Sequence, residues 1–525
     1  MSNNIRRNCL ALVVLMLATA TAHSQTRPTS EDPAVAAYVQ KHAVDILREF
    51  ANFLALPNVA SGTATGHHDV ERNTEAILHL LEKRGLRGEL LNVPGGFPVV
   101  FAEKRVPGAS KTVVFYAHYD GQPVSPEKWR NPPFSPVLLN GKLEDDAKPV
   151  SLDELHSPMP RNSEEWRLYA RSASDDKASI IDLLVALDAL RDQHIEPSVN
   201  LKIFFEGEEE AGSGHLGEIL ETYRGKLTSD LWVICDGPRH QSGRVQLVFG
   251  ARGVQGVDLT LFGPNRSLHS GHYGNWAPNP AAELANLLAG LRDEEGRIRI
   301  EGFYDPVRKI TSSETDAIAA APSVDSDLRS ELALGRTEGH GERIEMTLMQ
   351  PALNIRGIQA GEVGDRAANA IMTQATASID FRLVPNQTPD LVRRQVEGHF
   401  ARLGYFIVHE TPSIEARKIH PKLIQIDWDS GYPAARTPLD SASGKAVSES
   451  LQSVLSEPLI MLPTLGGSVP MYLFKEKLGT DAVILPIANF DNHQHSENEN
   501  IRLGNLWDGI QLYAALFEKL GSHWH

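Results

Sequence analysis

Four glutamates stand within five positions directly after an apolar run: Glu206, Glu208, Glu209 and Glu210 follow "VNLKIFF". Carboxylates that crowd at the end of a buried strand repel one another and resist the loss of their water. One interpretation is an acidic loop that stays in solvent. The other is a bound cation, whose charge reverses the local electrostatics.

Three further apolar runs also end in residues of the types that bind divalent metals. They are 112–117, followed by His118 and Asp120; 231–235, followed by Asp236; and 482–487, followed by His493 and His495. In an open α/β sheet, ligands bind outside the carboxyl ends of the strands. Imidazole and carboxylate groups suit zinc and related ions. The four strand ends together favour a metal site over a solvated acidic loop.

Two adjacent aspartates, Asp175 and Asp176, precede a segment with helical periodicity at 179–192. A carboxylate in this position can cap the helix by accepting hydrogen bonds from its free N–H groups. A cap needs only one aspartate. The other can bridge two metal ions, which lie ~3.5–4 Å apart in dinuclear hydrolases.

The elements that must position these residues form an α/β layer. The four apolar runs lack alternation, which is typical of strands buried on both faces. Helical patterns occur at 33–56, 74–85 and 179–192. Strands that alternate with helices predict a mostly parallel sheet with flanking helices.

The middle of the chain has a different pattern. The segments 253–263 and 375–385 alternate apolar and polar residues, and a helical pattern lies between them at 279–293. Alternation is typical of half-buried antiparallel strands. We therefore expect an inserted α+β domain over 253–415, with 304–350 as a surface excursion. The flanking segments, 25–252 and 416–525, then form the two parts of one catalytic domain.

Length and charge limit the alternatives. The chain has 525 residues, and single cores stop growing at about 250–300 residues, so two domains are expected. The formal net charge is −16, which disfavours nucleic acid and anionic membranes as partners.

The N-terminus has the layout of a secretory signal peptide over residues 1–24. Arg6 and Arg7 precede an apolar run at 10–18, and small residues follow at 20–22. The run is too short to remain as a membrane-spanning helix. The sequence therefore predicts an exported protein, periplasmic or secreted, without stable membrane insertion. Removal of this segment leaves Cys235 as the single cysteine, so no internal disulfide is expected.

Seven motifs together resemble the dinuclear zinc exopeptidases and deacylases, which include carnosinase-type dipeptidases, glutamate carboxypeptidase and succinyl-diaminopimelate desuccinylase. The motifs are "AHYDGQPV", "ARSASDDKAS", "FEGEEEAGSG", "CDG", "LHSGHYG", "LGGSVP" and "HQHSENEN". They occur in the family's order, and the likeness is closest to the nonspecific dipeptidase branch. The resemblance implies the zinc-exopeptidase fold, with the inserted domain as a lid and dimerisation domain.

The resemblance also implies roles for single residues. Two divalent ions per subunit are expected, zinc with manganese or cobalt as alternatives. Their ligands would be His118 and Asp236 for one ion, Glu210 and His495 for the other, and Asp175 for both. Asp120 would orient His118, and Glu209 would be the general base. His493 is the rival of His495, and Glu206 and Glu208 are treated as solvated or as supporting the ligands.

For the substrate, the resemblance implies that Arg382 binds a carboxylate and that Asn369, Gly467 and Ser468 line the same pocket. A solvated arginine is the alternative for Arg382, which lies in an alternating strand. His269 would reach the substrate across a homodimer, whereas a solvated loop histidine is its alternative.

The expected activity is metal-dependent hydrolysis of amide bonds in dipeptides or short peptides, by a water activated between two metals. The alternatives are an N-acyl or N-succinyl amino acid deacylase and a non-catalytic, metal-dependent peptide-binding protein. An extra polar segment at about 144–166, short or absent in the family, is expected near the site, where it narrows the substrate range.

Overall fold

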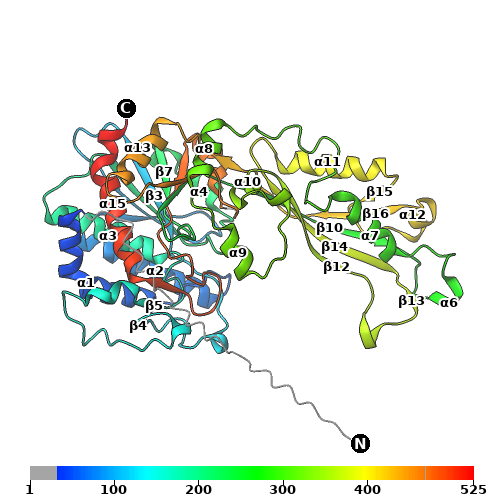
Figure 1. The fold of residues 1–525 in the computed structure, drawn as a ribbon, viewed down its shortest axis with the longest axis horizontal. Coiled ribbons are helices and arrows are strands. Elements are labelled where there is room, and N and C mark those ends of the chain that lie inside the picture. The colour runs from blue at the N-terminus through cyan, green and yellow to red at the C-terminus, as the bar shows by residue number, and fades with distance from the viewer. Residues whose placement is uncertain (1–31, 468) are drawn as a thin grey trace, which may run out of the picture.

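The structure is a computed structural model that describes residues 32–467 and 469–525. It has two units (Figure 1), each built around its own sheet. The predicted signal peptide lies outside the described residues, and so does Ser468. Within the described part of the chain, no helix is both long and apolar enough to cross a membrane.

The first unit contains an eight-stranded sheet in the order β1-β2-β6-β3-β7-β19-β8-β18. Its strands are β1 Gly88–Leu91, β2 Val99–Lys104, β6 Asn200–Glu206, β3 Thr112–His118, β7 Leu231–Ile234, β19 Ala482–Ile484, β8 Gln246–Val248 and β18 Ile460–Leu462. The central strands β6, β3, β7 and β19 run parallel, as predicted. Their carboxyl ends therefore meet at one edge of the sheet.

Helices cover both faces of this sheet because each central strand is apolar on both sides. Val113, Phe115 and Ala117 of β3 face a core formed with α1, α2, α3, α13 and α15, whereas Val114 and Tyr116 face α4, α5 and α14. The helices are α1 Pro33–Leu54, α2 Ala64–Lys83, α3 Lys177–Asp192, α13 Ala442–Gln452, α15 Leu503–His523, α4 Leu216–Thr222, α5 Arg224–Leu227 and α14 Met471–Leu473.

A small antiparallel sheet, in the order β20-β5-β4, lies in the same unit. Its strands are β4 Val137–Leu139, β5 Arg167–Tyr169 and β20 Asn500–Arg502. The extra segment at 144–166 connects β4 to β5. The carbonyl oxygen of Leu152 accepts a hydrogen bond from Arg48 of α1 at 3.1 Å, which ties this segment to the first helix.

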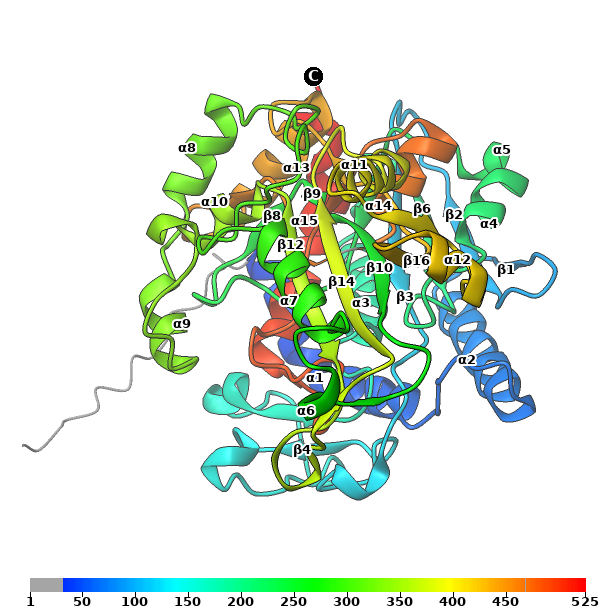
Figure 2. The ribbon, with the colours of Figure 1, turned by 90° about the vertical axis from the view of Figure 1, so that its right-hand side faces the viewer.

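The second unit has a five-stranded sheet in the order β12-β14-β10-β16-β15, which Figure 2 brings to the front. The strands are β12 Ala352–Gln359, β14 Gln374–Leu383, β10 Gly253–Phe262, β16 Leu423–Trp428 and β15 Phe406–Val408. Helices α7 Pro280–Leu291 and α11 Pro389–Arg402 pack against the apolar residues of one face. The alternation in β10 and β14 follows from this one-sided burial.

Two details differ from the sequence-based expectation for the middle of the chain. Strand β16 belongs to the second sheet although it lies beyond the expected boundary at residue 415. The expected surface excursion at 304–350 contains helices α8 Ser312–Ala320, α9 Asp325–Glu331 and α10 Ile344–Leu348. Ala317 of α8 packs into the core of the first unit, so part of this segment is integral to the fold.

Candidate metal centre

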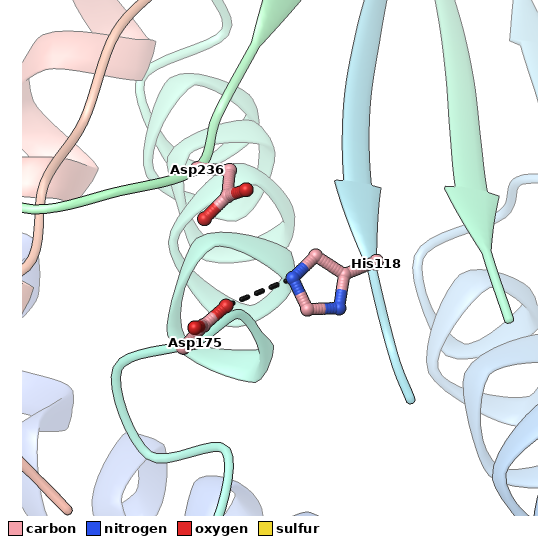
Figure 3. Close-up of side chains that lie close together, drawn as sticks. All are labelled: His118, Asp175 and Asp236. Atoms are coloured by element: carbon pink, nitrogen blue, oxygen red, sulfur yellow. Dashed lines mark hydrogen bonds and ion pairs between the residues drawn. The ribbon is translucent and has the colours of Figure 1, made fainter. Parts of the chain in front are cut away.

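Two overlapping groups of metal-binding side chains lie at the carboxyl edge of the eight-stranded sheet. One group is His118, Asp175 and Asp236, shown in Figure 3, and the other is Asp175, Glu210 and His495. In each group the ligand atoms lie within 4.8 Å of one another. Imidazole nitrogen and carboxylate oxygen are suitable donors for a divalent ion.

Asp175 belongs to both groups and directs one oxygen atom toward each. Its Oδ1 lies 2.9 Å from Nε2 of His118, and its Oδ2 lies 3.1 Å from Nε2 of His495. Asp175 directly precedes the Asp176 N-cap position of α3, and no side-chain hydrogen bond caps that helix. Asp176 therefore occupies the N-cap position, but its carboxylate does not accept the capping hydrogen bonds that the sequence led us to expect.

Asp120 organises the first group and the glutamate loop at once. Its Oδ1 lies 3.3 Å from Nδ1 of His118, so that Nε2 of this imidazole points toward Asp175. The same carboxylate accepts backbone hydrogen bonds from Glu209 at 3.1 Å and from Glu210 at 3.0 Å. One buried side chain thus fixes the ends of two neighbouring strands.

The carboxylates at this edge repel one another, and burial strengthens this effect. Burial, and then repulsion by Asp175, raises the pKa of Asp236 to about 6 and that of Glu210 to about 7. Burial also raises the pKa of Glu209 well above its ordinary value, with Asp236 and Asp175 adding to the shift. Carboxylates that repel one another in this way are stabilised in their charged form by a nearby cation.

The histidines show the complementary effect. Hydrogen bonding to Asp175 is the main cause that raises the pKa of His495 to about 9. Burial opposes charge on His118, but Asp120 and Asp175 outweigh it and raise the pKa of this imidazole. The carboxylates therefore draw positive charge to both histidines, which is the environment that a divalent ion would occupy.

The remaining glutamates of the acidic loop are buried rather than solvated. Glu206 accepts a hydrogen bond from the Tyr116 hydroxyl at 2.7 Å. Glu208 accepts one from the backbone of His215 at 2.7 Å, and its carboxylate also lies 3.1 Å from the imidazole of that residue. These contacts fix the loop on which Glu209 and Glu210 lie.

The residues expected at the substrate end lie apart from the two groups. His269 is exposed and ends β11 Leu268–His269, beside α6 Ser270–Tyr273, and its Nδ1 accepts a hydrogen bond from Gly271. Asn369 lies next to it, since its carbonyl oxygen accepts a bond from Ser270 at 2.9 Å. Figure 1 shows α6 at the end of the second unit that lies farthest from the eight-stranded sheet.

Arg382 lies near the end of β14, where its Nε donates to Asp380 at 3.0 Å. The carbonyl oxygen of Gly467 accepts a hydrogen bond from the backbone of Arg252, directly before β10. These two expected pocket residues therefore lie near the junction of the two units. His493, the rival of His495, belongs to neither group and lies 4.0 Å from Glu144.

Two residues at the site escaped the sequence-based prediction. Gln122 donates to Oε2 of Glu210 at 2.7 Å. Glu499 is buried and accepts hydrogen bonds from the loop that carries Asp175. Both lie inside the motifs quoted above, but a polar residue next to a ligand gives no signal of its own.

Comparison with known proteins gives a consistent result. Residues 146–519 match the sequence pattern of "Peptidase family M20/M25/M40". The chain is 25% identical over 433 residues to the Cys-Gly metallodipeptidase dug1 of Schizosaccharomyces pombe. This alignment covers 81% of this chain and 83% of the relative. The chain is also 25% identical over 543 residues to the human Beta-Ala-His dipeptidase, covering 98% and 97% of the two chains.

Among solved structures, the M20 family metallo-carboxypeptidase Sso-CP2 from Sulfolobus solfataricus aligns with a TM-score of 0.71 at 30% identity. The alignment covers 91% of this chain and 99% of that one.

The comparisons overturn the prediction of an exported protein. The relatives include the Cys-Gly metallodipeptidases of three yeasts, and nothing in this similarity supports a secretory signal. A charged start followed by a short apolar run was the only basis for that prediction, and residues 1–24 lie outside the described structure.

Proposed function

This chain belongs to the peptidase family M20/M25/M40. From that premise we propose that its two groups of ligands bind the metal ions that hydrolysis of dipeptides requires. The chain is a metal-dependent hydrolase, and its relatives are named as dipeptidases, so deacylation of N-acyl amino acids is not favoured. The observation that carries the proposal is Asp175, which presents one oxygen to each group.

His118 and Asp236 would hold one ion, Glu210 and His495 the other, and Asp175 both. The mixed nitrogen and oxygen donors fit zinc, which we propose as the native metal, and they also accommodate manganese or cobalt. When bound, two such ions polarise the scissile carbonyl and lower the pKa of water.

Glu209 is the proposed general base. It accepts a proton from the attacking water, whose oxygen bonds to the carbonyl carbon, and delivers that proton to the amine as the C–N bond breaks. The backbone hydrogen bond from Glu209 to Asp120 supports this role, because it fixes the loop next to His118.

For the substrate, Arg382 would bind the terminal carboxylate, with Asn369, Gly467 and Ser468 lining the pocket. His269 and Asn369 lie on the distal end of the second unit, away from the ligands of their own chain. We therefore propose a homodimer in which the inserted domain, which starts at residue 253 and extends past the expected boundary at 415 to include β16, is both lid and dimerisation surface between the two segments of the catalytic domain. His269 and Asn369 would then contribute to the site of a second copy, next to Arg382 and Gly467 of that copy.

A second candidate is removal of the C-terminal residue from longer peptides. It is favoured by the similarity to the carboxypeptidase Sso-CP2, whose 30% identity is the highest among the relatives described above. Both activities require the same metal ligands and the same recognition of a terminal carboxylate.

One substrate panel tests these proposals. The metal-free protein would be reloaded with zinc, manganese or cobalt and assayed on β-Ala-His, Cys-Gly, blocked tetrapeptides with a free C-terminus, and N-acetyl and N-succinyl amino acids. We expect metal-dependent cleavage of the dipeptides. Preferential cleavage of the blocked tetrapeptides would favour the carboxypeptidase, and cleavage of the N-acyl amino acids alone would contradict both.

A further inference from the structure

A fully buried carboxylate, Glu499, lies between the two loops that supply Asp175 and His495. It follows His495 by four residues and directly precedes β20, and its exposed fraction is 0%. Among the described residues, it belongs to neither group of candidate ligands. A carboxylate buried so completely requires strong partners, because losing its water is costly.

Five donors, all from residues 171–175, surround this carboxylate. Oε2 accepts from Nη1 of Arg171 at 2.7 Å and from the backbone of Ser172 at 3.0 Å. Oε1 accepts from the backbone and hydroxyl of Ser174 at 2.9 and 3.0 Å, and from the backbone of Asp175 at 3.0 Å. Hydrogen bonds to an ionised acceptor are about twice as strong as neutral ones.

The partner cation is itself held in place. Arg171 is 3% exposed, and its guanidinium lies 5.1 Å from the ring centroid of Trp129. The backbone carbonyl oxygen of Glu499 also accepts a hydrogen bond from Ala170 at 3.1 Å. The side chain and the backbone of Glu499 therefore both accept hydrogen bonds from the loop at 170–175 and connect the two loops.

We propose that Glu499 is a positioning residue that holds Asp175 in register with His495 and thereby sets the affinity for the metal ions. It acts through the backbone N–H of Asp175 rather than through contact with substrate or metal. This inference rests on the proposed dinuclear site and adds to it a residue that keeps the shared ligand in place before an ion arrives.

The site requires a carboxylate rather than an amide, because all five partners donate. In a Glu499→Gln variant, the new NH₂ group would face either the two donors at Oε2 or the three donors at Oε1. Two donors that face each other cannot form a hydrogen bond, so loop 171–175 must shift. Loss of a residue that orients a metal ligand typically weakens metal binding ~10–100-fold.

The test compares Glu499→Gln with Glu497→Gln, a matched change in the same loop at an exposed residue that bonds only its neighbour Ser496 among the contacts described. Zinc affinity would be measured by competition with a chromophoric chelator, and folding by thermal unfolding of the metal-free proteins. We expect ~10–100-fold weaker zinc binding for Glu499→Gln and wild-type binding for Glu497→Gln.

A purely structural role would lower the unfolding temperature but leave the zinc affinity of the folded variant unchanged, and this result would overturn the proposal. If Glu499→Gln does not fold, Ser174→Ala decides, because it removes one of the five donors. About tenfold weaker zinc binding would support the proposal, and unchanged binding would overturn it. Wild-type protein that binds no zinc would instead refute the dinuclear site itself.

Discussion

At the scale of single residues, the Asp120 side chain holds several other residues in position at once. It touches the imidazole of His118 and the backbone of Glu209 and Glu210, so a shift of any one of the three alters the others. The proposed base and the proposed ligands therefore share one support. Their separate roles can be distinguished by changing one functional group at a time.

Glu209→Gln should retain both metals and lower kcat by about 10²–10⁴-fold, because the amide keeps the shape of the loop but cannot accept the proton. Turnover and metal content would be measured on the same preparation. Glu218→Gln, at an exposed position on α4, is the control and should behave as wild type. Near-normal turnover with full metal content would mean that another residue is the base.

Asp175→Ala should lose metal at both positions, since one side chain serves both groups. Asp236→Ala removes a ligand from one group alone. This variant should bind the ion held by Asp175, Glu210 and His495 more tightly than the ion at the group that has lost Asp236. Elemental analysis after gel filtration would count the metals in each variant. Two ions retained in Asp175→Ala would show that this aspartate does not bridge them.

At the scale of elements, the start of α3 is attached to the end of α1. Lys177, the first residue of α3, is fully buried, and its ammonium donates to the carbonyl oxygens of Phe53 at 2.9 Å and Leu56 at 3.0 Å. Carbonyl groups at a helix C-terminus lack partners within the helix. Lys177 supplies hydrogen-bond donors to two carbonyl groups at this end of α1 and thereby anchors the loop that precedes α3.

Lys177→Met should therefore lower the free energy of unfolding by ~1–3 kcal/mol, because the carbonyl oxygen of Leu56 loses its donor and that of Phe53 keeps only the backbone N–H of Leu56, at 3.3 Å. Urea unfolding followed by circular dichroism would measure the change. Lys445→Met, at an exposed position on α13, removes the same charge without this contact and is the control. Equal unfolding midpoints for the two variants would contradict the anchoring role.

The strands and helices of this protein differ in how well the sequence predicts them. The run 112–117 became β3 Thr112–His118, and 231–235 became β7 Leu231–Ile234, because strands buried on both faces require contiguous apolar residues. The sequence also brought together candidate metal ligands from their place after such strands, and the structure places them in two groups that could hold an ion. Helix α8 could not be predicted, because its apolar residues are few and pack against a distant part of the chain.

Buried polar residues are the other class that sequence patterns miss. Glu499 lies in a polar segment, and its partners are 324–328 positions away in the chain. Glu206 and Glu208 likewise resemble a solvated acidic loop until the structure shows Tyr116 and His215 beside them. A carboxylate that is paired over such a distance has the same local sequence as one in water.

At the scale of the whole molecule, the proposed dimer makes catalysis depend on two copies. His269→Ala should lower kcat by about 10²–10³-fold with little change in metal content, since one hydrogen-bond donor to a developing oxyanion contributes ~2.7–4 kcal/mol. Solution mass would be measured by light scattering. A fully active monomer would contradict the trans-acting role.

Mixing His269→Ala with Asp175→Ala tests the same role without relying on one variant. If subunits exchange, a mixed dimer has one site with intact ligands and an intact His269 from the other copy. Activity should then rise above that of either variant alone. Absence of recovery, with exchange demonstrated by differently tagged subunits, would place His269 outside the site of the second copy.

Strand β19 lies between β7 and β8 in the large sheet, and His495 and Glu499 follow it late in the chain. A nascent polypeptide that has not yet emerged from the ribosome as far as β19 lacks a central strand of the large sheet, and it lacks His495 and Glu499 as well. The centre therefore cannot assemble before the segment from β19 to Glu499 has been synthesised. We therefore expect peptide hydrolysis only from chains that extend beyond Glu499.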